Sequence, residues 1–115
     1  MKHQRIILFL LTFICVFQLS AQKRTLKRGE NLYKTYSYAE SIKKYEAITD
    51  KTIDIYRKLA ESYYNIGKLN KAEDNWKIVV ENESRTADDI YSYASVLSMN
   101  KKYKESENGC GSLIK

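Results

Sequence analysis

Apolar residues follow two different patterns along the chain. Residues 6–17 form an apolar run that only Thr12 interrupts, and this run comes directly after the basic residues Lys2 and Arg5. Beyond residue 23, apolar and small residues recur three or four positions apart, which places them on one face of a helix. Proline is absent and only four glycines occur, which disfavours a turn-rich β fold. The pattern predicts an apolar leader followed by an all-α domain.

The N-terminal pattern is typical of a secretory signal peptide, with a basic start, a short apolar run and a small residue before the cleavage site. We predict that residues 1–21 are removed by a cut between Ala21 and Gln22. A membrane-spanning helix needs about 20 apolar residues, whereas this run has 12. An uncleaved anchor is therefore the less favoured alternative. Cys15 is interpreted as part of the packing of the leader.

A repeat appears when the mature sequence is compared with itself at offsets of 31 and then 34 residues. One position is always small and is followed three residues later by a larger side chain: Gly29, Ala60 and Ala94, then Leu32, Tyr63 and Leu97. The second half aligns as Tyr38, Leu69 and Tyr103; Ser41, Ala72 and Ser106; Tyr45, Trp76 and Cys110; Ile48, Val79 and Leu113. Small residues let paired helices approach, and large ones fill the space between pairs. Each copy is predicted to be a helix, a turn and a second helix.

The repeats divide the chain into a leader, one helical domain and a tail. The domain covers residues 22–108, with repeats at about 22–52, 53–86 and 87–108. Helices are expected at residues 24–34, 38–48, 53–66, 69–81 and 87–99, with a weak one at 103–107. Gly67 is expected to end a helix. Three pairs are expected to cap helix starts, namely Ser37 with Glu40, Asn70 with Glu73, and Thr86 with Asp89.

The third copy is predicted to be incomplete. Gly109 and Gly111 should interrupt its second helix, because each costs about 1 kcal/mol relative to alanine in a helix interior, so residues 109–115 are expected to form a flexible tail. Cys110 also stands where the other copies have a bulky aromatic. We therefore expect the helix at 87–99 to expose part of the face that carries Tyr93 and Leu97.

Residues suited to catalysis are scarce in the mature chain. The only histidine is His3, inside the leader, so no imidazole remains for a hydrolase triad, a metal site or a general base. The pairs Asp88 with Asp89 and Glu105 with Glu107 are interpreted as helix caps or solvated groups. Cys110, the one cysteine outside the leader, is interpreted as a packing residue or as part of the flexible tail. We therefore expect no enzyme activity, no catalytic residues, no metal and no cofactor.

Residues 53–73 closely resemble a tetratricopeptide repeat. The landmarks of that family are present as Tyr56, Leu59, Ala60, Tyr63, Gly67 and Ala72. The chain departs from the pattern in having Ser84 where many such repeats have proline, and in having Arg28 and Tyr93 at the leucine position of the other two copies. The resemblance implies antiparallel helix pairs stacked as a short right-handed solenoid of about three repeats, the last incomplete.

The N-terminal region also resembles that of OmpA-family envelope proteins of gram-negative bacteria that carry tetratricopeptide repeats. The similarity lies in the end of the leader at Ser20 to Lys23, in residues 29–38 and in residues 43–47. It implies an exported protein of the periplasm, with association to the outer membrane a possibility that it leaves open. The propeller and the OmpA-like domain of such proteins are not part of this sequence, so peptidoglycan binding by that domain is not carried over.

Eight of the ten tyrosines fall into two groups. Tyr45, Tyr56, Tyr63, Tyr93 and Tyr103 occupy packing positions of the repeat, each with its hydroxyl at the rim. Tyr33, Tyr64 and Tyr91 turn toward the inner face formed by the first helix of each pair. The candidate binding groove on that face consists of Glu30, Tyr33, Lys34, Asp54, Arg57, Glu61, Tyr64, Asn65, Tyr91 and Ser95.

Such a groove suits a peptide or a partner helix, and the alternative is that its members are ordinary exposed helix residues. The clamp by which chaperone-binding tetratricopeptide domains hold a carboxylate is not predicted, since Glu30 and Ser92 replace its asparagine and arginine. Without the leader, 18 basic and 14 acidic side chains remain, which indicates a solvated surface rather than a nucleic-acid patch. A small-molecule substrate is not expected either.

The sequence therefore predicts a protein-interaction scaffold of the cell envelope that binds a protein or peptide partner. It is either a separate scaffold or the N-terminal piece of a longer OmpA-like protein that continues into further domains. The alternative function is a peptidoglycan- or glycan-binding protein that uses the same groove tyrosines.

Overall fold

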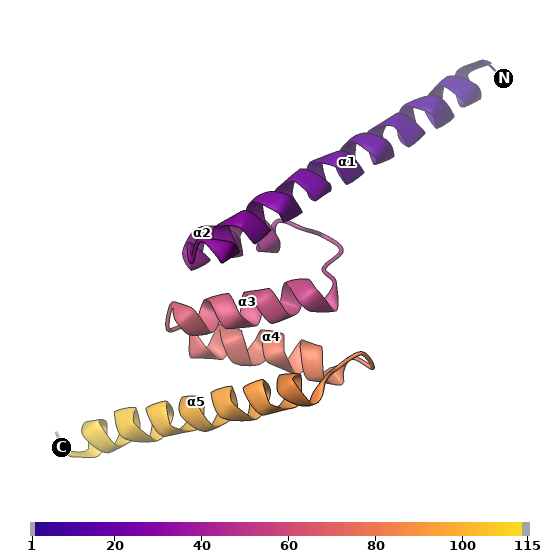
Figure 1. Cartoon of the computed structure of the whole chain (residues 1–115). Helices are drawn as coiled ribbons and strands as arrows, with labels where there is room; N and C mark the ends of the chain where they lie inside the picture. Colours follow the sequence, from indigo (N-terminus) through magenta and orange to yellow (C-terminus); the bar gives the residue numbers. More distant parts are fainter. Residues whose placement is uncertain (1, 114–115) are drawn as a thin grey trace.

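The computed structural model describes the backbone of residues 2–113 and, apart from Val16, the side chains of residues 2–107 (Figure 1). This part of the chain is all-helical and contains no strand. Its five helices are α1 Lys2–Lys34, α2 Tyr38–Glu46, α3 Ile53–Asn65, α4 Leu69–Glu81 and α5 Ala87–Leu113. Each helix packs on the next along the chain. The all-α prediction is confirmed, and the long helices α1 and α5 flank the short ones between them (Figure 1).

The turns that join α1 to α2 and α3 to α4 are built in the same way. After α1, the backbone N–H of Tyr36 donates to Tyr33 (3.0 Å) and that of Ser37 to Leu32 (2.8 Å). After α3, the same two bonds recur at the same two lengths with every residue number raised by 31. This pair of bonds satisfies carbonyls that the helix end leaves free, and it requires a left-handed residue between them. That residue is Tyr36 (φ 61°) in the first turn and Gly67 (φ 81°) in the second.

The core lies between the helices of the two hairpins and against α5. Its buried apolar residues are Ile42, Tyr45, Ile48, Ile55, Leu59, Ala60, Tyr63, Ala72, Trp76, Val79 and Val96. A Cβ added to Gly29 would lie 3.1 Å from a ring carbon of Tyr45, so the small residue of the first copy does permit close approach of α1 and α2. Tyr45 itself is fully buried and its hydroxyl has no hydrogen-bond partner among the described residues. The expectation that this hydroxyl reaches the rim is wrong.

Helix α1 differs from the prediction in where it begins. The helix expected at residues 24–34 is continuous with the leader and starts at Lys2, because no glycine or proline interrupts residues 18–23. The large apolar side chains of the leader that the structure describes are exposed on the surface. Helix α1 is long and apolar enough to cross a membrane, and an N-terminal signal sequence has the same properties.

Helix α5 differs more, because it is one helix where two were predicted. It runs without a break from Ala87 to Leu113, so neither the turn near residue 100 nor the interruption at Gly109 and Gly111 occurs. Lys101 aligns with Tyr36 and Gly67, and lysine is a good helix former. Residues 114–115 of the expected tail, and the side chain of Cys110, lie outside the described residues.

The straight course of α5 changes which residues of the third copy are buried. Ala94, the equivalent of the buried Gly29 and Ala60, is exposed. Leu97 is 36% exposed, as predicted for that face, whereas Tyr93 is half-buried and packs against the core. Tyr103 was expected in the core, but it is 62% exposed. No helix covers this side of α5 within residues 2–113.

Helix caps agree with the prediction at α5 and disagree at α2 and α4. At α5, the Thr86 N–H donates to Asp89 Oδ2 (2.8 Å), and the Asp89 N–H donates to Thr86 Oγ1 (3.2 Å). Ser37 precedes α2 without a side-chain cap, and Lys68 takes the cap position of α4. The side chains expected to cap α4 instead accept hydrogen bonds from the buried Asn100 Nδ2 of α5. These bonds measure 2.8 Å to Asn70 Oδ1 and 2.5 Å to Glu73 Oε2.

Candidate functional site

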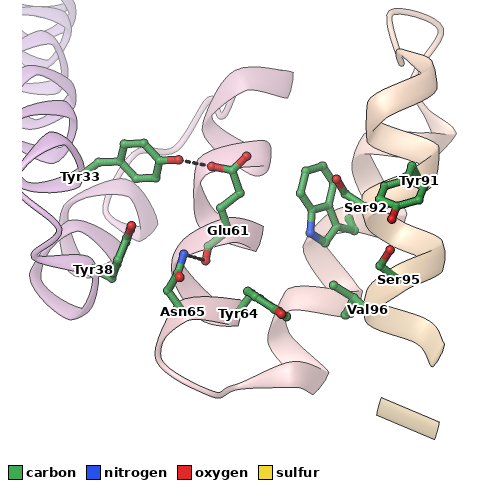
Figure 2. Close-up of a pocket in the computed structure, with 10 residues that line it drawn as sticks. Tyr33, Tyr38, Glu61, Tyr64, Asn65, Tyr91, Ser92, Ser95 and Val96 are labelled. Atoms are coloured by element: carbon green, nitrogen blue, oxygen red, sulfur yellow. Dashed lines mark hydrogen bonds between the residues drawn. The ribbon is translucent and has the colours of Figure 1, made fainter. Parts of the chain in front are cut away.

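A cavity of about 390 Å³ opens on one side of the molecule, and all five helices contribute to its wall (Figure 2). The lining residues are Tyr33, Tyr38, Glu61, Tyr64, Asn65, Trp76, Tyr91, Ser92, Ser95 and Val96. We call this cavity, defined by these ten residues, the tyrosine cleft. Its volume lies within the range of small-ligand pockets, about 300–1,000 Å³. Because every helix supplies part of the wall, the cleft depends on the packing of the whole domain.

The first hairpin supplies one aromatic side of the cleft. Tyr33 lies in the last turn of α1 and Tyr38 is the first residue of α2. The tight turn between them brings their rings to an edge-to-face arrangement, with the centroids 5.8 Å apart and the planes at 78°. This is a favourable geometry for two aromatic rings. The turn with the left-handed Tyr36 therefore positions this wall.

Helix α3 supplies the polar centre of the cleft. Glu61, Tyr64 and Asn65 are spaced three and four residues apart, so they share one helix face. The Tyr33 hydroxyl donates a hydrogen bond to Glu61 Oε2, and the Asn65 side chain donates to the Glu61 carbonyl at 2.8 Å (Figure 2). Burial, followed by the bond to the Glu61 carboxylate, raises the pKa of Tyr33 well above its usual range. Tyr33 is consequently a neutral hydroxyl that orients the carboxylate.

Helices α4 and α5 supply the opposite wall. Trp76 of α4 and Val96 of α5 are each 4% exposed and form the apolar part of the lining. Tyr91 is 75% exposed and Tyr64 is 41% exposed, so both rings have large surfaces available to a ligand. The Tyr64 hydroxyl also contacts Met99 Sδ of α5 at 3.5 Å. This wall is apolar at depth and aromatic at its edge.

The chemistry of the cleft is that of binding. Glu61 is the only charged residue in the lining, and the other polar groups are tyrosine and serine hydroxyls, the Asn65 amide and the Trp76 indole. Across the part of the chain that the structure describes, no three His, Cys, Asp or Glu residues converge as metal ligands would. The arrangement can stack on a ligand, donate and accept hydrogen bonds, and place one carboxylate beside it.

The structure brings together six of the ten residues predicted for the groove. Those that line the tyrosine cleft are Tyr33, Glu61, Tyr64, Asn65, Tyr91 and Ser95. Glu30, Lys34, Asp54 and Arg57 lie outside it. Lys34 is exposed at the end of α1, and Glu30 Oε1 lies 3.7 Å from Lys58 Nζ of α3. The cleft is therefore narrower than the predicted groove.

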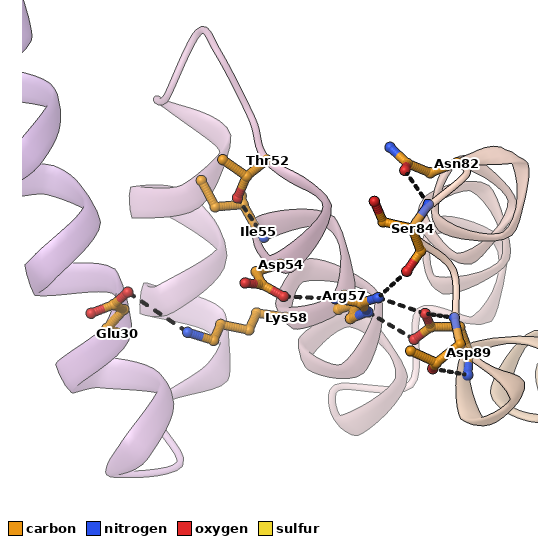
Figure 3. Close-up of polar contacts among 10 residues, drawn as sticks. Glu30, Thr52, Asp54, Ile55, Arg57, Lys58, Asn82, Ser84 and Asp89 are labelled. Carbon is orange, nitrogen blue, oxygen red and sulfur yellow. Dashed lines mark hydrogen bonds and ion pairs between the residues drawn. The ribbon is translucent and has the colours of Figure 1, made fainter.

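Arg57 forms contacts within the chain that the sequence did not indicate (Figure 3). Its guanidinium donates to both carboxylate oxygens of Asp89, at 2.8 and 2.7 Å, and to Asp54 Oδ1 at 2.7 Å. The Asp89 side chain is only 6% exposed. The Arg57 guanidinium, opposed by burial and helped by the bonds from Thr86, holds the pKa of Asp89 below its usual range. Arg57 thus ties α3 to the start of α5.

Four lining residues were not predicted as groove residues, namely Tyr38, Trp76, Ser92 and Val96. Trp76 was assigned to packing by the repeat register, whereas Tyr38 was aligned with Leu69 and Tyr103 and given neither a packing nor a groove role. Trp76 is indeed buried at 4% exposure, yet one part of its surface faces the cleft. On α5, Ser92, Ser95 and Val96 lie one turn apart on a single helix face. This spacing could have indicated that they line the same site.

Comparison of the chain with models of protein families, with curated proteins and with solved structures finds no match in any of the three.

Proposed function

We propose that this chain is an exported helical-repeat scaffold of the tetratricopeptide type, which binds a protein or peptide partner in the tyrosine cleft. The observation that carries the proposal is the cleft itself, which is built by all five helices and lined by four tyrosines and one carboxylate. Concave, mostly aromatic sites with a few placed polar groups are typical of binding sites, and tyrosine is enriched where proteins recognise one another.

The repeat interpretation is supported by the two hairpins. Their turns share the same hydrogen bonds at positions 31 residues apart, and each places a left-handed residue at the equivalent position. The small residues Gly29 and Ala60 are both buried between paired helices. A stack of such pairs, with α5 as the first helix of a third, would be a short right-handed solenoid with the cleft on its inner face.

Export is supported by the N-terminal half of α1, which begins with the basic residues Lys2 and Arg5 and continues as an exposed apolar run. We propose removal of residues 1–21 and a periplasmic location, with the chain acting alone or as the N-terminal module of an OmpA-like envelope protein. Intact-mass measurement of the protein from the periplasm should show Gln22 as the first residue. A membrane-bound product that keeps Met1 would replace this with the anchor interpretation.

Partner capture from an envelope extract tests the cleft. The mature chain is immobilised as wild type and as the double variant Tyr64→Ala, Tyr91→Ala, both residues being exposed in the lining. We expect the double variant to lose at least ten-fold in captured partner. The matched control is Tyr103→Ala, which removes a tyrosine that is 62% exposed outside the cleft. Equal capture by all three proteins would remove the cleft from consideration.

A glycan ligand is the second candidate, and the exposed rings favour it. Tyr91 and Tyr64 offer faces on which a sugar could stack, and Asn65, Ser92 and Ser95 could bond its hydroxyls. Co-sedimentation with purified peptidoglycan distinguishes the two candidates. Sedimentation that is lost in the Tyr64→Ala, Tyr91→Ala variant, without capture of any protein, would favour the glycan.

A further inference from the structure

The charge of the tyrosine cleft is opposite to that of the chain. The sequence carries a net charge of +6, and basic side chains are spread along every helix. The lining of the cleft nevertheless contains one carboxylate, Glu61, and no lysine, arginine or histidine. Among the described residues, the four ion pairs involve other carboxylates and leave Glu61 without a cationic partner. Glu61 is therefore the one charged group in the lining, and it has no ion-pair partner among the described residues.

The carboxylate is held in place rather than mobile. Glu61 is half-buried, and its Oε2 atom accepts the hydrogen bond from the Tyr33 hydroxyl. Tyr33 cannot neutralise the charge, because its hydroxyl remains protonated. The Oε1 atom has no hydrogen-bond partner among the described residues. A donor that enters the cleft can therefore reach this oxygen.

The walls around Glu61 suit a cation as well. Tyr33, Tyr38, Tyr64, Tyr91 and Trp76 all line the cleft. The faces of aromatic rings attract cations within about 6 Å, and the attraction grows when water is excluded. The chain already shows one such contact, since Lys58 Nζ lies 6.0 Å from the centroid of the Tyr33 ring. Aromatic walls with one carboxylate are complementary to a positive charge.

Other ligand classes fit less well. An anionic group would meet the Glu61 carboxylate, and like charges repel at this range. A purely apolar side chain would take water away from the carboxylate without replacing its hydrogen bonds, which is unfavourable. A cationic side chain supplies both the opposite charge and the donors.

We infer that the tyrosine cleft binds a lysine or arginine side chain of the partner, with Glu61 as the counter-ion and the tyrosine rings as its walls. This inference rests on the proposed partner-binding function and names the chemistry of the ligand. The cleft volume of about 390 Å³ accommodates one long side chain and a short stretch of peptide. The occupant is therefore a basic residue in an extended or turn segment of a partner protein.

Trp76 is the only tryptophan of the chain and lines the cleft, so its fluorescence reports occupancy directly. The probes are four blocked tripeptides, acetyl-Ala-X-Ala-amide, in which X is lysine, arginine, glutamine or glutamate. We expect the lysine and arginine peptides to bind at least ten-fold more tightly than the glutamine peptide, and the glutamate peptide most weakly. Added salt should reduce the difference, because it screens charge pairs.

The variant Glu61→Gln keeps the shape of the side chain and an acceptor for Tyr33 but removes the charge. We expect it to bind the lysine and glutamine peptides within two-fold of each other, while its thermal unfolding stays cooperative. Glu81→Gln is the matched control, because it removes a carboxylate from an exposed position outside the cleft. This control should keep the full preference for the cationic peptides.

Equal binding of the lysine and glutamine peptides by wild type would overturn the inference, as would an undiminished preference in Glu61→Gln. Partner capture separates this failure from failure of the proposed function. If capture requires Tyr64 and Tyr91 but is unchanged in Glu61→Gln, the cleft binds the partner and the cationic ligand is wrong. If the tyrosine variant also captures normally, the proposed function fails as well.

Discussion

The second and third copies of the repeat carry the same pattern, yet they differ in structure. In the second copy, α3 and α4 form a hairpin, and Ala60 is fully buried. In the third, α5 continues straight through the equivalent of the turn, and Ala94 is exposed. A small residue at this position marks a place where a helix can pack, and it does not by itself bring that helix there.

The residue at the turn accounts for the difference. Gly67 adopts φ 81° after α3, and a Cβ there would meet nothing within 4 Å. The glycine is needed for its backbone conformation alone, which other residues adopt only with strain. The third copy has Lys101 at this place, which continues the helix. Without the turn, the following residues cannot return to cover the face of Ala94.

The largest expected change in stability concerns Trp76, the bulky aromatic residue of the second copy. The third copy has Cys110 at the equivalent position. Trp76 is 4% exposed and contacts the cleft between α4 and α5. Trp76→Ala should lower the free energy of unfolding by about 3–5 kcal/mol, the usual loss for a buried aromatic. Urea unfolding followed by circular dichroism measures it.

The control for Trp76 is an aromatic residue on α5. Tyr103→Ala removes a ring that is 62% exposed, and we expect a change within about 0.5 kcal/mol. A loss of several kcal/mol at Tyr103 would mean that the second half of α5 is covered in solution. The contrast between the two copies would then be lost.

The next prediction concerns the contact between Arg57 and Asp89, which joins the second copy to the third. Arg57 and Asp89 join α3 to the first turn of α5 through two hydrogen bonds with charged groups. Asp89→Asn should destabilise the domain by about 1.5–3 kcal/mol, the range for such bonds when one partner is lost. Asp88→Asn is the matched control, because Asp88 is an exposed carboxylate of the same turn and should change the stability by less than about 1 kcal/mol.

Acid should remove the stabilisation that Asp89 provides. The pKa of Asp89 is lowered in the folded protein, so its contribution is present above the unfolded value of about 3.9 and is lost as pH falls through the folded pKa. The difference in unfolding free energy between wild type and Asp89→Asn should therefore shrink below about pH 4. A difference that stays constant from neutral pH to pH 3 would show that the carboxylate charge is not involved.

Helix boundaries were predicted correctly where a residue at the boundary itself favours the start or the end of a helix. The hairpin of α3 and α4 was predicted from Gly67 and the spacing around Ala60, and Thr86 with Asp89 caps α5 as expected. Three boundaries failed. No glycine or proline stops a helix in residues 18–23 or at Lys101, and α5 also continues through Gly109 and Gly111. The repeat register suggested the break near residue 100, and the helix propensity of Lys101 favoured continuation instead.

The candidate site was predicted in part, for a related reason. Tyr64 and Tyr91 could be found by elimination, since the repeat leaves them no packing role. Arg57 shares a helix face with Tyr64, but its partner Asp89 is 32 residues away along the chain. Local spacing carries no information about a contact between residues so far apart in sequence. Trp76 was assigned to the core, and the sequence could not show that one edge of a buried ring also borders a cavity.

The paired alanines give the most direct comparison of the two copies. Ala60→Leu should destabilise by about 1–3 kcal/mol, because the larger side chain has no space between α3 and α4. Ala94→Leu should change the free energy of unfolding by less than about 0.5 kcal/mol, because the residue is exposed on a helix that favours leucine. Urea unfolding of both variants checks this. Equal losses would show that a helix covers Ala94 in solution.

The smallest effect concerns the two left-handed turn residues. Tyr36 has φ 61°, a conformation that costs a non-glycine residue about 1–2 kcal/mol. Tyr36→Gly should relieve this, but it also removes an edge-to-face contact with Tyr38, whose centroid is 6.1 Å away. We expect a net gain of about 0.5 kcal/mol in the free energy of unfolding, since glycine also has more freedom to lose on folding.

Gly67→Ala should do the reverse and lower the free energy of unfolding by about 1 kcal/mol through its φ alone, because the added Cβ has free space. Thermal unfolding of the two variants should therefore shift in opposite directions. If Tyr36→Gly is instead as destabilising as Gly67→Ala, the Tyr36 ring contributes more than its backbone strain costs, and the two turns would be equivalent in geometry but not in what stabilises them.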